Sequence, residues 1–151
     1  MQAASILTSY RARMATEVAR VGAGITAREA TLPSSEPLPF LELKSDGGGG
    51  GGGGCAVFLH GMTANAVLSI DSFAAFASAA GPSGPSRYLM ADALGHGGRG
   101  DWTLETGLEP RYSIENHVND LEVVLDALEV EGPVDLIGYS MGGRTAYEYA
   151  L

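Results

Sequence analysis

The sequence feature that most constrains the fold lies near the C-terminal end of the chain, at residues 138–142. These residues read Gly-Tyr-Ser-Met-Gly and follow a short apolar run at residues 134–137. Residues 143–151 then begin a segment with the composition of a helix. When the G-x-S-x-G pattern lies in a sharp turn between a strand and a helix, it is typical of a nucleophilic serine at the apex of that turn. Because glycine on both sides removes clashing side chains, the pattern predicts an exposed nucleophile at Ser140. A glycine-rich turn without chemistry is the alternative.

The rest of the chain alternates short apolar runs, which predict strands, with longer amphipathic segments, which predict helices. We expect strands over residues 40–44, 55–59, 88–91 and 134–137, and helices over residues 5–30, 67–80 and 114–128. Ser113 can cap the last helix, whose apolar side chains recur at spacings of four and three, and His117 is expected at its surface. The acidic residues outside the apolar stripe are expected on its solvated side: Asp120, Glu122, Asp126 and Glu129. Alternating strands and helices predict an α/β fold, with a mainly parallel sheet and flanking helices.

A proline-rich segment at residues 31–39 suggests a division of the chain at residue 37. Residues 1–37 are predicted to form an N-terminal arm or a transit segment, since residues 1–30 carry four arginines against two glutamates. A poorly ordered arm or an amphipathic helix is the alternative. Residues 38–151 are predicted to form the folded domain. The eight glycines of residues 47–54 cannot pack in a core, and they predict a flexible loop between two strands.

Charge and cysteine content exclude several classes of function. The chain has a formal net charge of −9, of which residues 1–30 carry +2, so the remainder carries −11. This balance argues against a nucleic-acid partner, which requires clustered Lys and Arg. A single cysteine, Cys55, excludes an internal disulfide and a cysteine-rich metal site, and we expect it to be a small buried side chain.

The apolar runs of the sequence also limit where the protein can act. No run reaches 18 apolar residues, so we expect no transmembrane segment. No apolar core with a cleavage site follows Met1, so secretion is not expected. We predict an intracellular protein, cytoplasmic by default, with plastid or mitochondrial targeting as the alternative.

Three motifs occur in the order and at the spacing found in the α/β-hydrolase superfamily. They are Phe-Leu-His-Gly at residues 58–61, Asp-x-x-Gly-His-Gly at residues 92–97 and Gly-Tyr-Ser-Met-Gly-Gly at residues 138–143. Each follows an expected strand, and the resemblance covers about residues 38–151, the N-terminal portion of that fold. It implies an α/β-hydrolase-fold enzyme that attacks an ester, thioester or related carbonyl of a small-molecule substrate. A flavodoxin-like sheet with chance glycine turns is the alternative.

The resemblance implies roles for individual residues of this chain. Ser140 matches the catalytic nucleophile, and the backbone N–H groups of Met62 and Met141 match the oxyanion hole. The two methionine side chains are expected to line the pocket. His60 and His96 could be taken for general bases, but the matching histidines of the family hold the loops beside the site. We therefore expect both histidines to have structural roles.

The serine turn also resembles that of one group within the superfamily, the succinyl-hydroxycyclohexadiene-carboxylate synthases of menaquinone and phylloquinone biosynthesis. Residues 138–144, Gly-Tyr-Ser-Met-Gly-Gly-Arg, carry this resemblance. Those enzymes are lyases that eliminate pyruvate, and their arginines hold substrate carboxylates. The resemblance implies that Tyr139 and Arg144 bind substrate. A surface position for Arg144, without a role in binding, remains an equal alternative.

A second glycine pattern, at residues 95–100, fits the G-x-G-x-x-G fingerprint of dinucleotide-binding sites. That fingerprint requires a helix that opens on its third glycine. Residues 101–110 lack helical apolar spacing and contain Gly107 and Pro110. We therefore predict no nucleotide cofactor, and the sequence indicates no metal site.

The family places its catalytic acid and histidine after the serine, and no Asp or His follows Ser140 in this sequence. The sequence therefore predicts a truncated fragment that lacks the C-terminal strands and helices. Its serine-bearing strand would be an unpaired sheet edge, so a missing C-terminal half or a partner would be needed for stability. Such a chain alone is expected to be inactive, and a non-catalytic half-domain is the remaining alternative.

Overall fold

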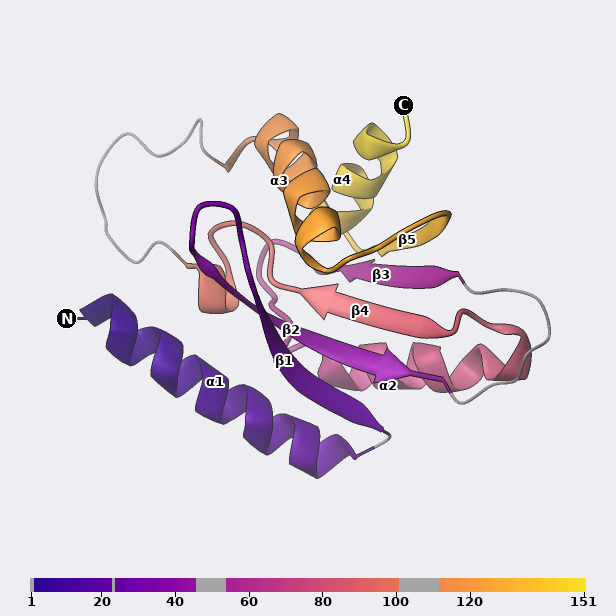
Figure 1. The fold of residues 1–151 in the computed structure, drawn as a ribbon, viewed down its shortest axis with the longest axis horizontal. Helices are drawn as coiled ribbons and strands as arrows, with labels where there is room; N and C mark the ends of the chain where they lie inside the picture. The colour runs from indigo at the N-terminus through magenta and orange to yellow at the C-terminus, as the bar shows by residue number, and fades with distance from the viewer. Residues whose placement is uncertain (1, 23, 46–53, 101–111) are drawn as a thin grey trace.

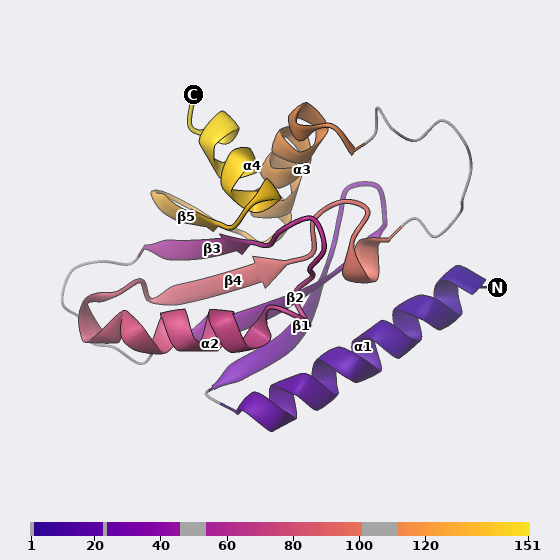
Figure 2. The same cartoon turned by 180° about the vertical axis from the view of Figure 1, so that it is seen from behind.

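The computed structural model describes residues 2–22, 24–45, 54–100 and 112–151 (Figure 1). The predicted glycine loop at residues 47–54 lies outside this part of the chain, except for Gly54. The elements are α1 Gln2–Val21, β1 Ile25–Thr31, β2 Pro37–Lys44, β3 Cys55–Leu59, α2 Ile70–Ala79, η1 Gly81–Ser83, β4 Arg87–Ala91, η2 Gly97–Arg99, α3 Ile114–Ala127, β5 Val134–Gly138 and α4 Met141–Tyr149. Helices α1 and α2 cover one face of the sheet, and α3 and α4 cover the other (Figures 1 and 2).

The described strands form one sheet in the order β1-β2-β4-β3-β5. Strand β3 pairs in parallel with both β4 and β5, which confirms the parallel part of the predicted sheet. The N-terminal hairpin of β1 and β2 is antiparallel, and it joins the sheet through an antiparallel pairing of β2 with β4. As expected for the serine-bearing strand, β5 lies at an edge of the described sheet.

The connections of the parallel strands set the position of the serine turn. The chain runs from β3 through α2 to β4, and then returns through α3 to β5 on the other side of β3. Because α2 and α4 leave β3 and β5 toward opposite faces, the carboxyl ends of these two strands flank a topological switch point (Figure 2). The His-Gly turn after β3 and the serine turn after β5 both lie at this point.

Each face of the sheet has its own apolar core. The α1/α2 face includes Met14, Phe73 and Met90, and the α3/α4 face includes Val57, Leu89 and Leu125. Most strand predictions hold within two residues, because continuous apolar runs match strands that are covered on both faces. Cys55 is buried as predicted, at the start of β3, and burial raises the pKa of its thiol.

The predicted helix over residues 5–30 is wrong in its second half. Helix α1 ends at Val21, because the chain turns through Gly22 and Gly24, which both have positive φ. Residues 25–31 instead form β1, which pairs along its length with β2. The division placed at residue 37 falls at the first residue of β2.

Helix α1 packs against the α1/α2 face through a narrow apolar stripe. Met14 is 2% exposed within the core, and Tyr10, Val18 and Val21 pack around it. Two ion pairs hold the helix at its sides. Arg11 contacts Glu29 of β1 at 2.5 Å, and Arg20 contacts Asp71 of α2 at 2.8 Å.

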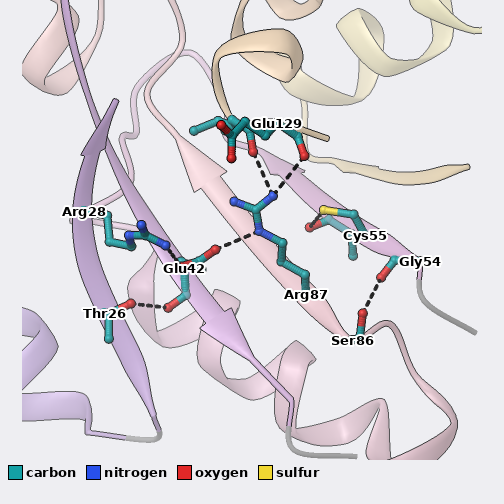
Figure 3. A network of polar contacts seen from close by, with 10 residues as sticks. Thr26, Arg28, Glu42, Gly54, Cys55, Ser86, Arg87 and Glu129 are labelled. Atoms are coloured by element: carbon teal, nitrogen blue, oxygen red, sulfur yellow. Dashed lines mark hydrogen bonds and ion pairs between the residues drawn. The ribbon is translucent and has the colours of Figure 1, made fainter. Parts of the chain in front are cut away.

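A buried carboxylate joins the hairpin to the rest of the sheet (Figure 3). Glu42 of β2, whose side chain is 3% exposed, accepts hydrogen bonds from Arg28 of β1 and from Arg87 of β4, at 2.7 Å for the latter. Arg87 also donates to the carbonyl of Leu128, at the C-terminal end of α3. Burial alone would raise the pKa of Glu42, but the two guanidinium groups outweigh burial and hold this pKa below its ordinary value.

Replacing Met14 by alanine should destabilise the protein by about 2–4 kcal/mol, because it leaves a cavity where α1 meets the sheet. Chemical denaturation of the 151-residue chain measures the change. The exposed neighbour Arg13 provides the control, and Arg13→Ala should cost less than about 0.5 kcal/mol. Equal effects of the two substitutions would show that α1 does not pack on the sheet in solution.

Replacing Glu42 by glutamine should cost about 1.5–3 kcal/mol at pH 7, because it removes two charge-assisted hydrogen bonds. The native pKa of Glu42 is lowered, so its stabilisation is complete above the unfolded pKa of about 4.3 and disappears as pH falls through the native pKa. The stability gap between wild type and variant should therefore close in acid. Glu122→Gln, on the exposed side of α3, should show no gap at either pH.

Candidate active site

Ser140 occupies the tight turn between β5 and α4, in a backbone conformation that residues other than glycine rarely adopt. Its φ of 53° and ψ of −115° lie outside the regions favoured by residues other than glycine. A Cβ at Gly138 would lie 2.3 Å from the carbonyl oxygen of Gly142, and one at Gly142 would lie 2.1 Å from that of Leu59. Both glycines are therefore required by close backbone approach. This is the steric reason for which the sequence pattern predicts a serine turn.

Backbone hydrogen bonds hold this turn against the end of β3. The N–H of Tyr139 donates to the carbonyl of Leu59 at 3.0 Å, which extends the pairing of β5 with β3 by one residue. The N–H of Arg144 donates to the carbonyl of Ser140 at 3.0 Å, so α4 begins directly after the serine. The turn fixes the Ser140 side chain at an exposed position beside the N-terminal end of α4.

The His-Gly turn after β3 packs directly on the serine turn. A Cβ at Gly61 would lie 3.1 Å from the Tyr139 ring and 3.5 Å from Cβ of Ser140. Met62 follows this turn and Met141 follows the serine. No hydrogen bond between described residues uses the backbone N–H of either methionine. The two amides predicted as oxyanion donors therefore adjoin Gly61 and Ser140 in the chain and have no acceptor in its described part.

His60 is buried, and its ring forms hydrogen bonds that connect the ends of β3 and β4. The N–H of Ala93 donates to its Nε2 at 2.9 Å, so this nitrogen carries no proton, and Nδ1 donates to the carbonyl of Gly61 at 2.8 Å. Burial lowers the pKa of His60 and favours this neutral form. Both ring nitrogens are therefore occupied, which agrees with the structural role expected from the sequence.

The other two histidines extend from His60 toward α3. His96 lies with Nε2 2.6 Å from the carbonyl oxygen of Met62 and Nδ1 3.0 Å from that of Leu94. His117 approaches the Leu94 carbonyl as well, with Nε2 at 3.3 Å. The ring centroids are 5.1 Å apart for His60 and His96, and 6.4 Å apart for His96 and His117. We call these three side chains the histidine row.

The prediction that His117 lies at the surface is wrong. Its side chain is buried, with 5% of the residue exposed, and its Nδ1 has no hydrogen-bond partner among the described residues. The reason is its helical position, one turn before Leu121 on the buried side of α3. The burial of His117 would have been predicted if this residue had been counted as part of the apolar stripe of the helix.

A second correction concerns Asp120, which the sequence placed on the solvated side of α3. Its carboxylate instead pairs with the buried guanidinium of Arg99, through hydrogen bonds of 2.6 and 2.7 Å. Arg99 also donates to the carbonyl of Asp92 at 3.1 Å. The pair fixes η2 to α3, and the local sequence carries no signal that would join two residues from separate elements.

The Asp92 carboxylate connects two loops of the site, a role that its place in the Asp-x-x-Gly-His-Gly motif does not indicate. It is buried, and its oxygens accept hydrogen bonds from the backbone N–H groups of Ala66 at 2.7 Å and Gly98 at 2.8 Å. These bonds join the segment after Met62 to η2. The carboxylate therefore acts as a structural link beside the site.

The two residues predicted to bind substrate are both exposed. Tyr139 is 78% exposed, with its ring against Gly61. The Arg144 side chain is 69% exposed, lies 4.0 Å from Glu148 and shares a groove between α3 and α4 with Glu115. This position leaves both sequence interpretations of Arg144 open.

A small cavity lies beside the serine turn. A space lined by His60, His117, Thr145 and Met141 offers about 40 Å³ to the centres of water molecules, which is enough only for water. Among the described residues no group of His, Cys, Asp and Glu has the arrangement of a metal site. No described helix is both long and apolar enough to span a bilayer. Residues 101–110, on which the rejection of a dinucleotide site depends, lie outside the described residues.

Comparison with known proteins places this geometry in a family. Residues 57–151 match the sequence profile of the alpha/beta hydrolase fold family. A protein of Bacillus subtilis (strain 168), named as a 2-succinyl-6-hydroxy-2,4-cyclohexadiene-1-carboxylate synthase, is 46% identical over 66 residues, which cover 44% of this chain and 22% of that protein.

Solved structures agree on the fold. A structure described as an acyltransferase from Salmonella enterica superposes with a TM-score of 0.62 at 21% identity, over 85% of this chain and 38% of that one. An alpha/beta hydrolase from Novosphingobium aromaticivorans superposes with a TM-score of 0.58 at 24% identity, over 84% and 39%. The chain thus spans less than two fifths of the length of these relatives. With its profile match over residues 57–151 and its strand–serine–helix turn, the chain belongs to the α/β-hydrolase fold family.

Proposed function

We propose that the whole protein is a serine-nucleophile enzyme that acts on an ester, thioester or related carbonyl of a small molecule. The observation that carries the proposal is the conformation of Ser140. A residue held at positive φ, between two glycines that tolerate no side chain, is a strained arrangement. A turn that served only to connect β5 with α4 would have no need of this strain.

The surroundings of Ser140 supply what a nucleophilic attack on a carbonyl needs. The serine oxygen would attack the carbonyl carbon and form a tetrahedral intermediate with a negatively charged oxygen. The N–H groups of Met62 and Met141, which have no acceptor among the described residues, would donate to that oxygen. The N-terminal end of α4 adds a favourable dipole at the same place.

The base that removes the Ser140 proton is proposed to come from elsewhere in the whole protein. No hydrogen bond in the described part of the chain joins Ser140 to an imidazole. His60 has both nitrogens occupied, and His96 and His117 face the carbonyls of Met62 and Leu94. The chain spans less than two fifths of the length of the Salmonella and Novosphingobium proteins, so a protein of their length has room for a histidine and an orienting carboxylate.

A lyase that eliminates pyruvate is the second candidate. It is favoured by the 46% identity over 66 residues to the Bacillus subtilis protein, compared with 21% and 24% for the two structures named above. In this candidate Arg144, exposed in the groove between α3 and α4, would bind a substrate carboxylate. The exposed ring of Tyr139, which lies against Gly61, would contact the substrate beside Ser140. A half-domain without catalytic activity is the outcome if neither test below succeeds.

In the full-length protein, Ser140→Ala should lower turnover of an activated ester or thioester by at least about a thousandfold, because it removes the nucleophile. Initial rates measure the loss. Ser78→Ala, which removes an exposed hydroxyl from α2, is the matched control and should leave the rate unchanged. Equal activity of Ser140→Ala and wild type would refute nucleophilic catalysis by this serine.

The lyase candidate predicts pyruvate release from a substrate that bears carboxylates, and a loss of substrate affinity in Arg144→Ala. The expected rise in KM is about tenfold or more, with partial recovery in Arg144→Lys, because the guanidinium binds a carboxylate by two hydrogen bonds. Hydrolysis of a neutral ester should be unaffected. If Arg144→Ala leaves the KM for the carboxylate substrate unchanged, Arg144 is a surface residue and the lyase assignment loses its residue-level support.

A further inference from the structure

Helix α1 reaches the loops of the candidate site through Tyr10. The Tyr10 ring lies over the backbone of η2, where a Cβ added to Gly98 would stand 2.9 Å from a ring carbon and 2.9 Å from the Pro39 side chain. Only glycine fits beneath this ring. This contact joins α1, at the N-terminal end of the chain, to η2, which follows β4.

The Tyr10 hydroxyl ends in an environment that is unusual for a phenol. It is buried and has no hydrogen bond of ordinary geometry to any described residue, although it lies next to the Asp92 carboxylate and the backbone of Val67. Burial, together with the negative charge of Asp92, raises the pKa of Tyr10 far above its ordinary value. The phenol therefore keeps its proton, and a small adjustment or one bridging water would pair it with the carboxylate.

Asp92 connects Tyr10 with the loops of the candidate site through its hydrogen bonds. Its two oxygens accept hydrogen bonds from the N–H groups of Ala66 and Gly98. Ala66 lies four residues after Met62, and Gly98 lies two residues after His96. His96 in turn contacts the Met62 carbonyl at 2.6 Å. This carbonyl belongs to the Met62–Thr63 peptide plane, so the His96 contact restrains the backbone torsions of Met62. Through those torsions it restrains the adjoining Gly61–Met62 plane, which carries the Met62 N–H.

We propose that Tyr10 is a positioning residue for the turn that carries Met62, and that it acts by donating its hydroxyl hydrogen bond to Asp92. The Tyr10–Asp92 pair holds Ala66 and Gly98 in register, and with them the His96–Met62 contact. Helix α1 is thereby part of the active-site framework, in addition to its packing on the sheet. The inference rests on the proposed role of the Met62 N–H in binding an oxyanion.

Tyr10→Phe tests the link, because it removes the hydroxyl and keeps the ring on Gly98. Amide hydrogen exchange of the 151-residue chain, resolved by residue, should become about tenfold faster at Ala66 and Gly98. The amides of Val57 and Leu89, in the centre of the sheet, should change by less than twofold. Tyr147→Phe, which removes an exposed hydroxyl from α4, is the matched control and should leave all four amides unchanged.

Two outcomes would overturn the proposal. If Tyr10→Phe leaves Ala66 and Gly98 unchanged, the hydroxyl does not act on Asp92. If all amides accelerate equally, the hydroxyl contributes only to global stability. The comparison requires no catalytic activity, so it stands even if Ser140→Ala shows that the proposed function is wrong.

A kinetic measurement in the full-length protein tests the final step to Met62. A misdirected oxyanion donor weakens binding of the transition state and leaves substrate binding intact, so Tyr10→Phe should lower kcat about three- to tenfold with little change in KM. A merely structural role would lower the amount of folded enzyme without changing the kcat per folded molecule. An unchanged kcat, in an enzyme that depends on Ser140, would show that the effect of Tyr10 ends at Asp92.

Discussion

The close approach of α4 to the end of β3 is the constraint on which the rest of the structure depends. The backbone of Gly142 lies so near the Leu59 carbonyl that a Cβ would stand 2.1 Å from it. This approach positions the turn at Ser140, brings the His60–Gly61 turn against it and forces Ser140 to a positive φ. The serine is therefore set by two backbones in contact, one from each side of the topological switch point.

Much of the fold could be predicted because its signals are local. The strands β3, β4 and β5 are continuous apolar runs, and the serine turn depends on glycines whose spacing is visible in the sequence. The Ser113 cap of α3 was also predicted, and its hydroxyl accepts a hydrogen bond from the N–H of Asn116. The exposed position of Ser140 follows from the same local pattern, whereas the oxyanion roles of the Met62 and Met141 amides come from the family resemblance and stay a prediction.

The parts that could not be predicted are those in which a polar group finds a distant partner. Asp120 pairs with Arg99 across 21 residues, and Glu42 binds Arg28 and Arg87 from two other strands. Such pairs leave no periodic signal, so a charged residue on a helix was assigned to solvent by default. The strand β1 was missed for a related reason, since most of its residues are exposed and it is defined by its pairing with β2.

The histidine row has a practical consequence for solution studies. His60, His96 and His117 are all the histidines of the chain, and they lie side by side next to the serine turn. Every imidazole resonance in a proton NMR spectrum of this chain therefore originates from the same small region. Ring-current shifts between the tilted neighbouring rings would report on any rearrangement there, so the protein carries its own spectroscopic probe of the site without chemical labelling.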